Sequence, residues 1–346
     1  MNVVGLDLGV HNFKGVEVKK DKGKLELVKF GMGEAAGSNL LSGSDVELAK
    51  YSQALKTFFD ESGFTTPNVV VAIPESGVFT RVIKVPKMTD KELKSAVPYE
   101  AEQYIPLPLK DVNFDYQVLD ETKETKDNKG TMEVLLVAAT KSLVEKYVKI
   151  IKDARLIPIG LEPETLALSR VVGDTKDQPN PSVIVTIDTN STTVIVTYKG
   201  VVRFTRNIST GGDALTRAIV QSLGFDFTQA EEYKKTYGLD ANQVDGKVFT
   251  AIKPVFDIIL GEIKRAFFFY TTHNSDVNIR RVVVCGGTAL MPGLLYYLTT
   301  NLNLEVELAD PWQKITFPSK LAKEKQFLSE KGPFFVTAVG LATKGE

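Results

Sequence analysis

Two short segments, far apart in the chain, each place an aspartate between an apolar strand and a tight polar turn. The first is residues 5–14 with Asp7, and the second is residues 187–193 with Asp188. Small residues at such turns let backbone N–H groups converge on phosphate oxygens. A carboxylate suits hydrated Mg²⁺, which keeps several waters and takes one or two protein carboxylates. Two such hairpins facing each other would hold a nucleoside triphosphate and its metal from both sides.

A third segment, residues 282–293, joins an apolar strand to a Gly-Gly turn and a helix start. Gly286 and Gly287 would let the backbone approach a flat ligand closely, and an ordinary strand-to-helix turn of an α/β sheet is the alternative. Two weaker signals are Thr-Gly-Gly-Asp at 210–213 and Ala-Glu-Glu-Tyr-Lys at 230–234. For the last of these, a solvated helix face is the alternative interpretation.

The elements that would position these segments occur twice. Residues 2–7, 14–18 and 25–30 have the alternation of three strands in a meander. After a stretch with linker composition at 174–181, residues 182–208 repeat this meander, with Asp188 in the place of Asp7. We therefore predict an internal duplication with the main domain boundary in the linker, and chance similarity of two meanders is the alternative.

Composition excludes several classes of protein. The 346 residues carry 42 Lys and Arg against 43 Asp and Glu, a net charge of -1, so no basic excess favours nucleic acid or an anionic membrane. The single cysteine, Cys285, rules out an internal disulfide framework, and two histidines leave little for a zinc centre. Residues 282–304 carry no charge and could span a bilayer, but Gly286-Gly287 and Pro292-Gly293 interrupt them. We expect a cytosolic protein with no membrane span.

In their order along the chain, five segments resemble the motifs of the actin-like ATPase superfamily. The resemblance implies an α/β, actin-like (ribonuclease H-like) duplicated two-domain fold around a central cleft. The segments are the first phosphate loop at 7–14, the first connecting motif at 161–168, the second phosphate loop at 188–193, the adenosine motif at 285–293 and the second connecting helix at 338–342.

The resemblance sharpens to one family through more specific strings. Residues 81–86 (Arg-Val-Ile-Lys-Val-Pro) lead to 100–106 (Glu-Ala-Glu-Gln-Tyr-Ile-Pro) and then to 113–119 (Asn-Phe-Asp-Tyr-Gln-Val-Leu). Over nearly the whole chain this is similar to the type IV pilus assembly protein PilM family. The related cell-division protein FtsA shares an inserted subdomain at this place but ends in an amphipathic membrane helix, which residues 340–346 do not resemble.

This resemblance implies boundaries for the domains. The first actin-like domain would comprise residues 1–83, 160–181 and about 333–346, and the small inserted α/β subdomain would comprise residues 84–159. The second domain would comprise residues 182–332, with a helical subdomain at about 225–275.

The resemblance also implies roles for individual residues. Asp7 and Asp188 would hold Mg²⁺ through water, and Glu162 would orient the attacking water, so these three form the expected catalytic set. The residues expected to surround ATP are Gly9, His11, Asn12, Lys14, Asn190, Ser191 and Thr192 at the phosphates, and Gly211, Gly212, Glu231, Lys234, Gly286, Gly287 and Thr288 at the ribose and adenine.

Two departures from the family pattern concern activity. Val10 stands where the family has a small hydroxyl residue, and Asn190 stands where it has glycine after the second Asp-x. Asn tolerates a left-handed backbone better than most residues, so we expect ATP binding to be retained. Because the usual glycine is missing at this position, we expect hydrolysis to be slow or absent.

The function implied is a cytoplasmic, ATP-binding component of the inner-membrane assembly platform of a type IV pilus or a related secretion system. It would be held at the membrane by the cytoplasmic N-terminal tail of PilN, with pilus motor ATPases left open as further partners. The apolar material available for that tail is Val97, Tyr99, Tyr104, Ile105, Leu107 and Phe114, although most of these could equally form the core of the insert. The alternatives are an FtsA-like cytoskeletal protein and a small-molecule kinase of the same superfamily.

Overall fold

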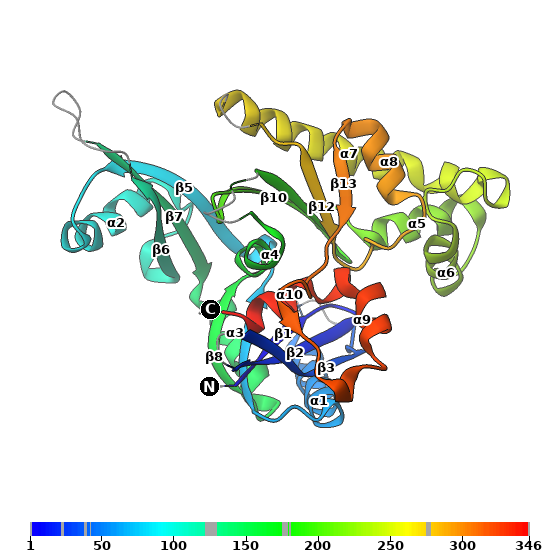
Figure 1. Ribbon diagram of the computed structural model, residues 1–346, viewed down its shortest axis with the longest axis horizontal. Helices are drawn as coiled ribbons and strands as arrows, with labels where there is room; N and C mark the ends of the chain where they lie inside the picture. The colour runs from blue at the N-terminus through cyan, green and yellow to red at the C-terminus, as the bar shows by residue number, and fades with distance from the viewer. Residues whose placement is uncertain are drawn as a thin grey trace.

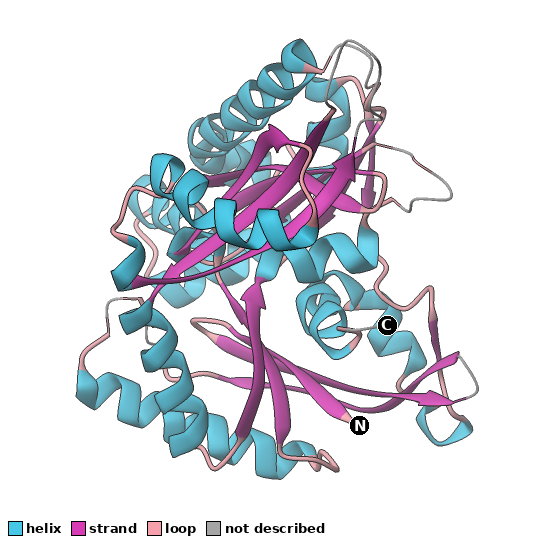
Figure 2. Ribbon diagram, turned by 90° about the vertical axis from the view of Figure 1, so that its left-hand side faces the viewer, coloured by secondary structure: helices cyan, strands magenta, loops and turns pink. Residues whose placement is uncertain are grey.

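The described residues form three β-sheets, two of them large and one small. The computed structural model describes residues 2–21, 24–37, 40–41, 43–121, 130–174, 179, 181–274 and 278–344. Most of the linker predicted at 174–181 lies outside these residues, as do the last two positions of the chain. Figure 2 shows the two large sheets one above the other, with helices packed around them.

The first large sheet begins with the predicted meander. Strands β1, β2 and β3 are antiparallel neighbours, and β4 and β8 then continue the sheet in parallel with β1. Its strands, in spatial order, are β14 (Ile315–Thr316), β3 (Lys24–Glu34), β2 (Asn12–Asp21), β1 (Val3–Leu8), β4 (Asn68–Ile73) and β8 (Ile157–Pro163).

The second large sheet repeats this arrangement. Strands β9, β10 and β11 form an antiparallel meander, and β12 and β13 extend it in parallel with β9. The order β11-β10-β9-β12-β13 therefore corresponds strand by strand to β3-β2-β1-β4-β8, which confirms the predicted duplication. The strands are β11 (Val201–Ile208), β10 (Thr192–Tyr198), β9 (Ser182–Ile187), β12 (Arg281–Cys285) and β13 (Glu305–Leu308).

Helices pack against the three sheets (Figure 1). They are α1 (Asp45–Ser62), α2 (Asp90–Tyr104), α3 (Lys141–Asp153), α4 (Glu164–Val172), α5 (Gly212–Leu223), α6 (Phe227–Tyr237), α7 (Lys247–His273), α8 (Leu294–Leu302), α9 (Lys325–Glu330) and α10 (Gly332–Ala342). Each of α1 and α2 begins at a capping box, Ser44 with Glu47 and Thr89 with Glu92, which satisfies free N–H groups of the first turn. Among the described residues, no helix has the length and apolar character needed to cross a membrane.

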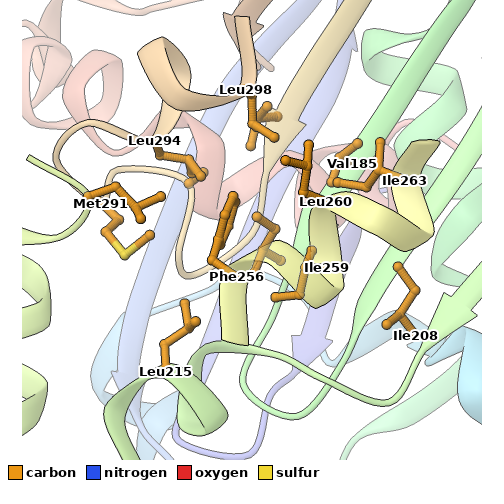
Figure 3. Close-up of a cluster of buried hydrophobic side chains, with 14 of the residues drawn as sticks. Val185, Ile208, Leu215, Phe256, Ile259, Leu260, Ile263, Met291, Leu294 and Leu298 are labelled. Carbon is orange, nitrogen blue, oxygen red and sulfur yellow. The ribbon is translucent and has the colours of Figure 1, made fainter. Parts of the chain in front are cut away.

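The largest core lies between the second sheet and the long helix α7. Phe256 is fully buried at its centre, and Leu294 and Leu298 of α8 and Val185 of β9 belong to the same cluster (Figure 3). Every residue of β9 is buried, as expected for a central strand of a sheet that is covered on both faces. This core gives the turn after β9 a rigid support.

Helices α4 and α10 join the two halves of the molecule. Leu168 of α4 and Val336 of α10 pack with Ile184 of the second sheet, while α10 also lies along β1 of the first. Two glycines permit this close packing. A Cβ on Gly5 would lie 2.0 Å from the Ala338 carbonyl oxygen, and one on Gly340 would lie 2.1 Å from that of Ala167. Any side chain at these positions would push the helices apart.

The third sheet, with α2 packed on it, forms the insert. It consists of β5 (Val78–Pro86), β7 (Thr131–Thr140) and β6 (Val112–Glu121), all antiparallel. Leu93 and Val97 of α2 are buried against it, and Figure 1 shows this sheet and α2 to one side of the two large sheets. The insert therefore has a hydrophobic core of its own.

Two segments pack differently from the predicted domain ranges. Helix α3 lies inside the predicted insert range 84–159, but its buried Leu143 and Tyr147 pack against the first sheet. Trp312 lies inside the predicted second-domain range 182–332, but it packs with Val16 of the first sheet, next to β14.

Candidate functional site

A cavity of about 1210 Å³ is lined by residues from both halves of the chain. The turns after β1, β9 and β12 all contribute, so the structure brings together three segments that are far apart in the sequence. Thirteen of the predicted residues line this cavity: Asp7, Gly9, His11, Asn12, Lys14, Asp188, Asn190, Ser191, Gly212, Glu231, Lys234, Gly287 and Thr288.

Asp7 and Lys14 form an ion pair in the first half of the cavity. The two residues are direct partners in the pairing of β1 with β2, and Lys14 Nζ lies 2.8 Å from Asp7 Oδ2. Burial by itself would lower the pKa of Lys14, but the Asp7 carboxylate beside it raises that pKa above its usual value. The ammonium group of Lys14 is therefore a permanent positive charge in the cavity.

Asp188 provides the second carboxylate. The hydroxyl of Thr186 donates to Asp188 Oδ2 at 2.7 Å, and the N–H of Gly287 also hydrogen-bonds to this carboxylate. Gly286 has φ +90°, and a Cβ there would lie 2.9 Å from Asp188 Oδ1, so glycine is needed at this turn. Burial and the charge of Asp7 raise the pKa of Asp188, because two carboxylates share the site.

The chemistry of these donors fits a hydrated divalent cation. Two carboxylates face a cavity that also contains turns rich in backbone N–H groups, the arrangement that Mg²⁺ with phosphate requires. Within the described parts of the chain, His, Cys, Asp and Glu nowhere form a group of three or more that could enclose a metal. A metal held mainly by water and phosphate fits this cavity better than one enclosed by protein ligands.

The turn after β1 approaches the start of α5 in the second half. Gly9 sits in a tight turn, where Tyr51 Oη donates to its carbonyl oxygen at 2.8 Å. From this turn His11 Nε2 lies 3.5 Å from Asp213 Oδ1, at the start of α5. This contact joins the first half of the chain to the second across the cavity.

A buried lysine supports the opposite wall. Lys234 Nζ donates to the Gly212 carbonyl oxygen at 3.0 Å and to Thr216 Oγ1 at 2.8 Å, and it lies 2.7 Å from Glu231 Oε2. Although burial would raise the pKa of Glu231, the charge of Lys234 lowers it below its usual value. Glu231 is therefore a fixed negative charge at the cavity wall, suited to accept hydrogen bonds from hydroxyl groups of a ligand.

Four predicted residues do not line the cavity. Glu162 is buried in an ion pair 2.8 Å from Arg170 and is also 3.3 Å from Lys344 Nζ, so it cannot orient a water there. The Thr192 hydroxyl points away and donates to the Thr210 carbonyl oxygen. Gly211 and Gly286 act in the supporting layer, where each permits close packing of the backbone around Asp188.

Glu164 was missed and lines the cavity in the place expected for Glu162. The backbone N–H of Glu75 donates to Glu164 Oε1 at 3.1 Å. Burial, followed by the charge of Asp188, raises the pKa of Glu164 well above its usual value. Its position at the end of β8, which runs parallel with β4 and β1, was the available signal, because the carboxyl ends of parallel strands share one edge.

The duplicated sheets and the cavity between them define an actin-like ATPase fold. Solved structures with this fold include the ethanolamine utilization protein EutJ of Carboxydothermus hydrogenoformans, which is 17% identical with TM-score 0.58, covering 100% of this chain and 90% of that one. Another is MreB5 of Spiroplasma citri bound to AMPPNP, 14% identical with TM-score 0.51, covering 89% and 91%.

The similarity to one family is much stronger. The structure of a PilM-PilN type IV pilus biogenesis complex is 27% identical with TM-score 0.85, covering 100% of this chain and 98% of that one. The family model of the type IV pilus assembly protein PilM matches residues 5–346, and the chain belongs to this family. The cell division protein FtsA of Bacillus subtilis is a more distant relative, 22% identical over 98% of this chain and 82% of that protein.

Proposed function

We propose that this actin-like component of type IV pilus assembly binds Mg-ATP in the cavity and binds the cytoplasmic N-terminal tail of a PilN-type protein. The observation that carries the nucleotide part is the pair of hairpins that bring Asp7 and Asp188 into one cavity. MreB5, which has the same fold, was solved with AMPPNP bound, and this supports the assignment.

In this proposal, the residues have separate tasks. Asp7 and Asp188 hold Mg²⁺ through water, and the metal would neutralise charge on the phosphates. Gly9 and Ser191 line the cavity, so backbone N–H groups of their turns would bind the phosphates, and Lys14 would add a positive charge. The remaining ligand residues are His11, Asn12 and Asn190 at the phosphates, and Gly212, Glu231, Lys234, Gly287 and Thr288 at the ribose and adenine.

Glu164 replaces Glu162 as the residue that would orient water in any hydrolysis. It lines the cavity, and its carboxyl is held by the Glu75 N–H. We expect slow turnover, since phosphoryl transfer depends on exact positioning and Asn190 stands where the family has glycine.

The partner is proposed from the solved PilM-PilN complex. In this chain, Val97 and Ile105 belong to the core of the insert, whereas Tyr99 is 74% exposed and Leu107 is 44% exposed. Exposed apolar side chains on a folded insert are suitable anchors for a short peptide. Through such a tail the protein would sit at the cytoplasmic face of the inner membrane. Pilus motor ATPases remain a prediction as further partners.

Calorimetric titration tests both parts. We expect the N-terminal peptide of the PilN encoded in the same genome to bind with micromolar affinity, and a scrambled peptide not to bind. Mg-ATP should bind to the same preparation in a separate titration. If the folded protein does not bind the peptide but phosphorylates a small molecule, it is instead a kinase of the superfamily.

A further inference from the structure

A buried carboxylate, Glu75, lies where the insert, the second half and the cavity meet. It occupies the short turn Glu75–Gly77 that connects β4 of the first sheet to β5 of the insert, and it is only 6% exposed. Its backbone N–H holds the Glu164 carboxyl, but nothing in the proposed chemistry uses its side chain. A buried carboxyl group is costly unless it is hydrogen-bonded, so its contacts indicate its role.

The side chain of Glu75 faces three threonines from three different elements. Thr165 of α4 donates to Glu75 Oε2 at 3.0 Å, and the hydroxyls of Thr205 in β11 and Thr80 in β5 lie close enough to act on its pKa. Burial raises that pKa, and the three hydroxyls act against the rise. One carboxyl group thus connects the connecting helix, the second half and the insert.

The backbone of Glu75 reaches into the cavity. Its N–H donates to Glu164 Oε1 at 3.1 Å, so the position of this turn determines where the Glu164 carboxyl lies. Thr80 Oγ1, by contrast, is buried without a hydrogen bond of good geometry within the described part of the chain. Because Thr80 belongs to the insert strand β5, a displacement of that strand would change the distance between this hydroxyl and the Glu75 carboxyl.

The insert is also tied to the second half beside this junction. Arg203 of β11 pairs with Glu133 of β7, and its other nitrogen lies 3.7 Å from Asp120 of β6. Strand β5 contacts β11. A movement of the insert relative to the second half would therefore change the positions of Thr205 and Thr80, two of the three threonines around Glu75.

We propose that Glu75 is a positioning residue that links the placement of the insert to the Glu164 carboxyl in the cavity. This proposal rests on the proposed function, because it couples the affinity for the peptide at the insert to the affinity for the nucleotide in the cavity. The coupling is reciprocal. If the peptide favours one arrangement of Thr80, Glu75 and Glu164, the nucleotide binds to a protein in that arrangement, and the nucleotide affects peptide binding by the same factor. The effect requires that the carboxyl accept hydrogen bonds, not that it be charged.

The test is the coupling ratio, the peptide affinity with saturating Mg-AMPPNP divided by the affinity without it. In the wild type we expect this ratio to differ from one by about fivefold or more, the low end of typical coupling. Glu75→Ala should bring the ratio to one while both ligands still bind. Glu75→Gln, which keeps an acceptor oxygen, should retain the wild-type ratio.

Glu17→Ala is the matched control. Glu17 is also a fully buried carboxylate held by a threonine, with the Thr65 N–H donating to Glu17 Oε2 at 2.8 Å, but it lies in β2, away from the junction. Its loss should lower stability and leave the ratio unchanged. A ratio of one in the wild type, a wild-type ratio in Glu75→Ala, or a ratio of one in Glu75→Gln would each overturn the proposal. Failure of either ligand to bind the wild type would instead overturn the proposed function.

Discussion

Lys14 Nζ lies 2.8 Å from Asp7 Oδ2, across the first two strands of the chain. The second half of the molecule carries Asp188 in the position equivalent to Asp7, but the position equivalent to β2 supplies no lysine that lines the cavity. The two duplicated hairpins therefore differ in charge. The first is an ion pair of Asp7 with Lys14, while the second is a carboxylate supported by Thr186 and Gly287 with no lysine in β10.

The first prediction concerns the proposed Mg²⁺ site. Mg-ATP at 100 times its dissociation constant should add about 2.7 kcal/mol to the free energy of unfolding, seen as a higher melting temperature. Asp188→Asn should abolish the magnesium-dependent part of that rise, because it removes a carboxylate that faces the cavity. Asp60→Asn, on the exposed end of α1, is the control and should respond like the wild type. An unchanged response in Asp188→Asn would mean that the metal is held elsewhere.

The second prediction separates the two glutamates near the end of β8. Wild-type turnover should be slower than about 1 s⁻¹, the low end of typical enzymes. Glu164→Gln should reduce single-turnover phosphate release about 100-fold, the lower limit for loss of a proton-transfer group. Glu162→Gln breaks a buried pair with Arg170, so it should cost about 3 kcal/mol of stability and leave turnover unchanged. Release assays and urea unfolding measure both, and the reverse pattern would restore Glu162 as the water-orienting residue.

The third prediction concerns the insert. The double change Tyr99→Ala with Leu107→Ala should weaken PilN-peptide binding at least tenfold without lowering the melting temperature, because both side chains are exposed. Leu93→Ala is the contrasting variant, since Leu93 is buried in the insert core and its loss should cost about 2–5 kcal/mol. Peptide titration with thermal unfolding measures both effects. Full peptide affinity in the double variant would place the binding site on another surface.

The fourth prediction follows from the raised pKa of Glu75. In the folded protein this carboxyl keeps its proton at pH values where the unfolded chain has released it, so the wild type loses stability as pH rises above the unfolded value near 4.5. The amide in Glu75→Gln does not titrate, so this variant should not lose that contribution to its stability. Its unfolding free energy, relative to the wild type, should therefore increase as the pH is raised from 4.5 toward neutral in urea titrations. A difference that is constant with pH would show that Glu75 titrates alike in both states.

Several features of the fold follow from the sequence alone. The alternating strands around Asp7 and around Asp188 predict two meanders, and the structure pairs both as predicted. Such patterns are local, because the period of apolar residues depends on which face of each strand is buried. The apolar strand and Gly-Gly turn of residues 282–293 predicted a surface that a flat ligand could approach closely. Gly287 lines the cavity, and the ligand itself stays a prediction.

Tertiary structure alone decided which side chains face the cavity. Glu162 and Glu164 are two residues apart at a strand-to-helix junction, and only the packed structure directs one to Arg170 and the other to the Glu75 N–H. The contact of His11 with Asp213 and the burial of Trp312 against the first sheet join residues about two hundred or more positions apart. No local pattern predicts such contacts, because they depend on how whole elements pack against one another. That packing is determined by the burial of apolar surfaces, and the sequence shows which residues are apolar but not which surfaces come together.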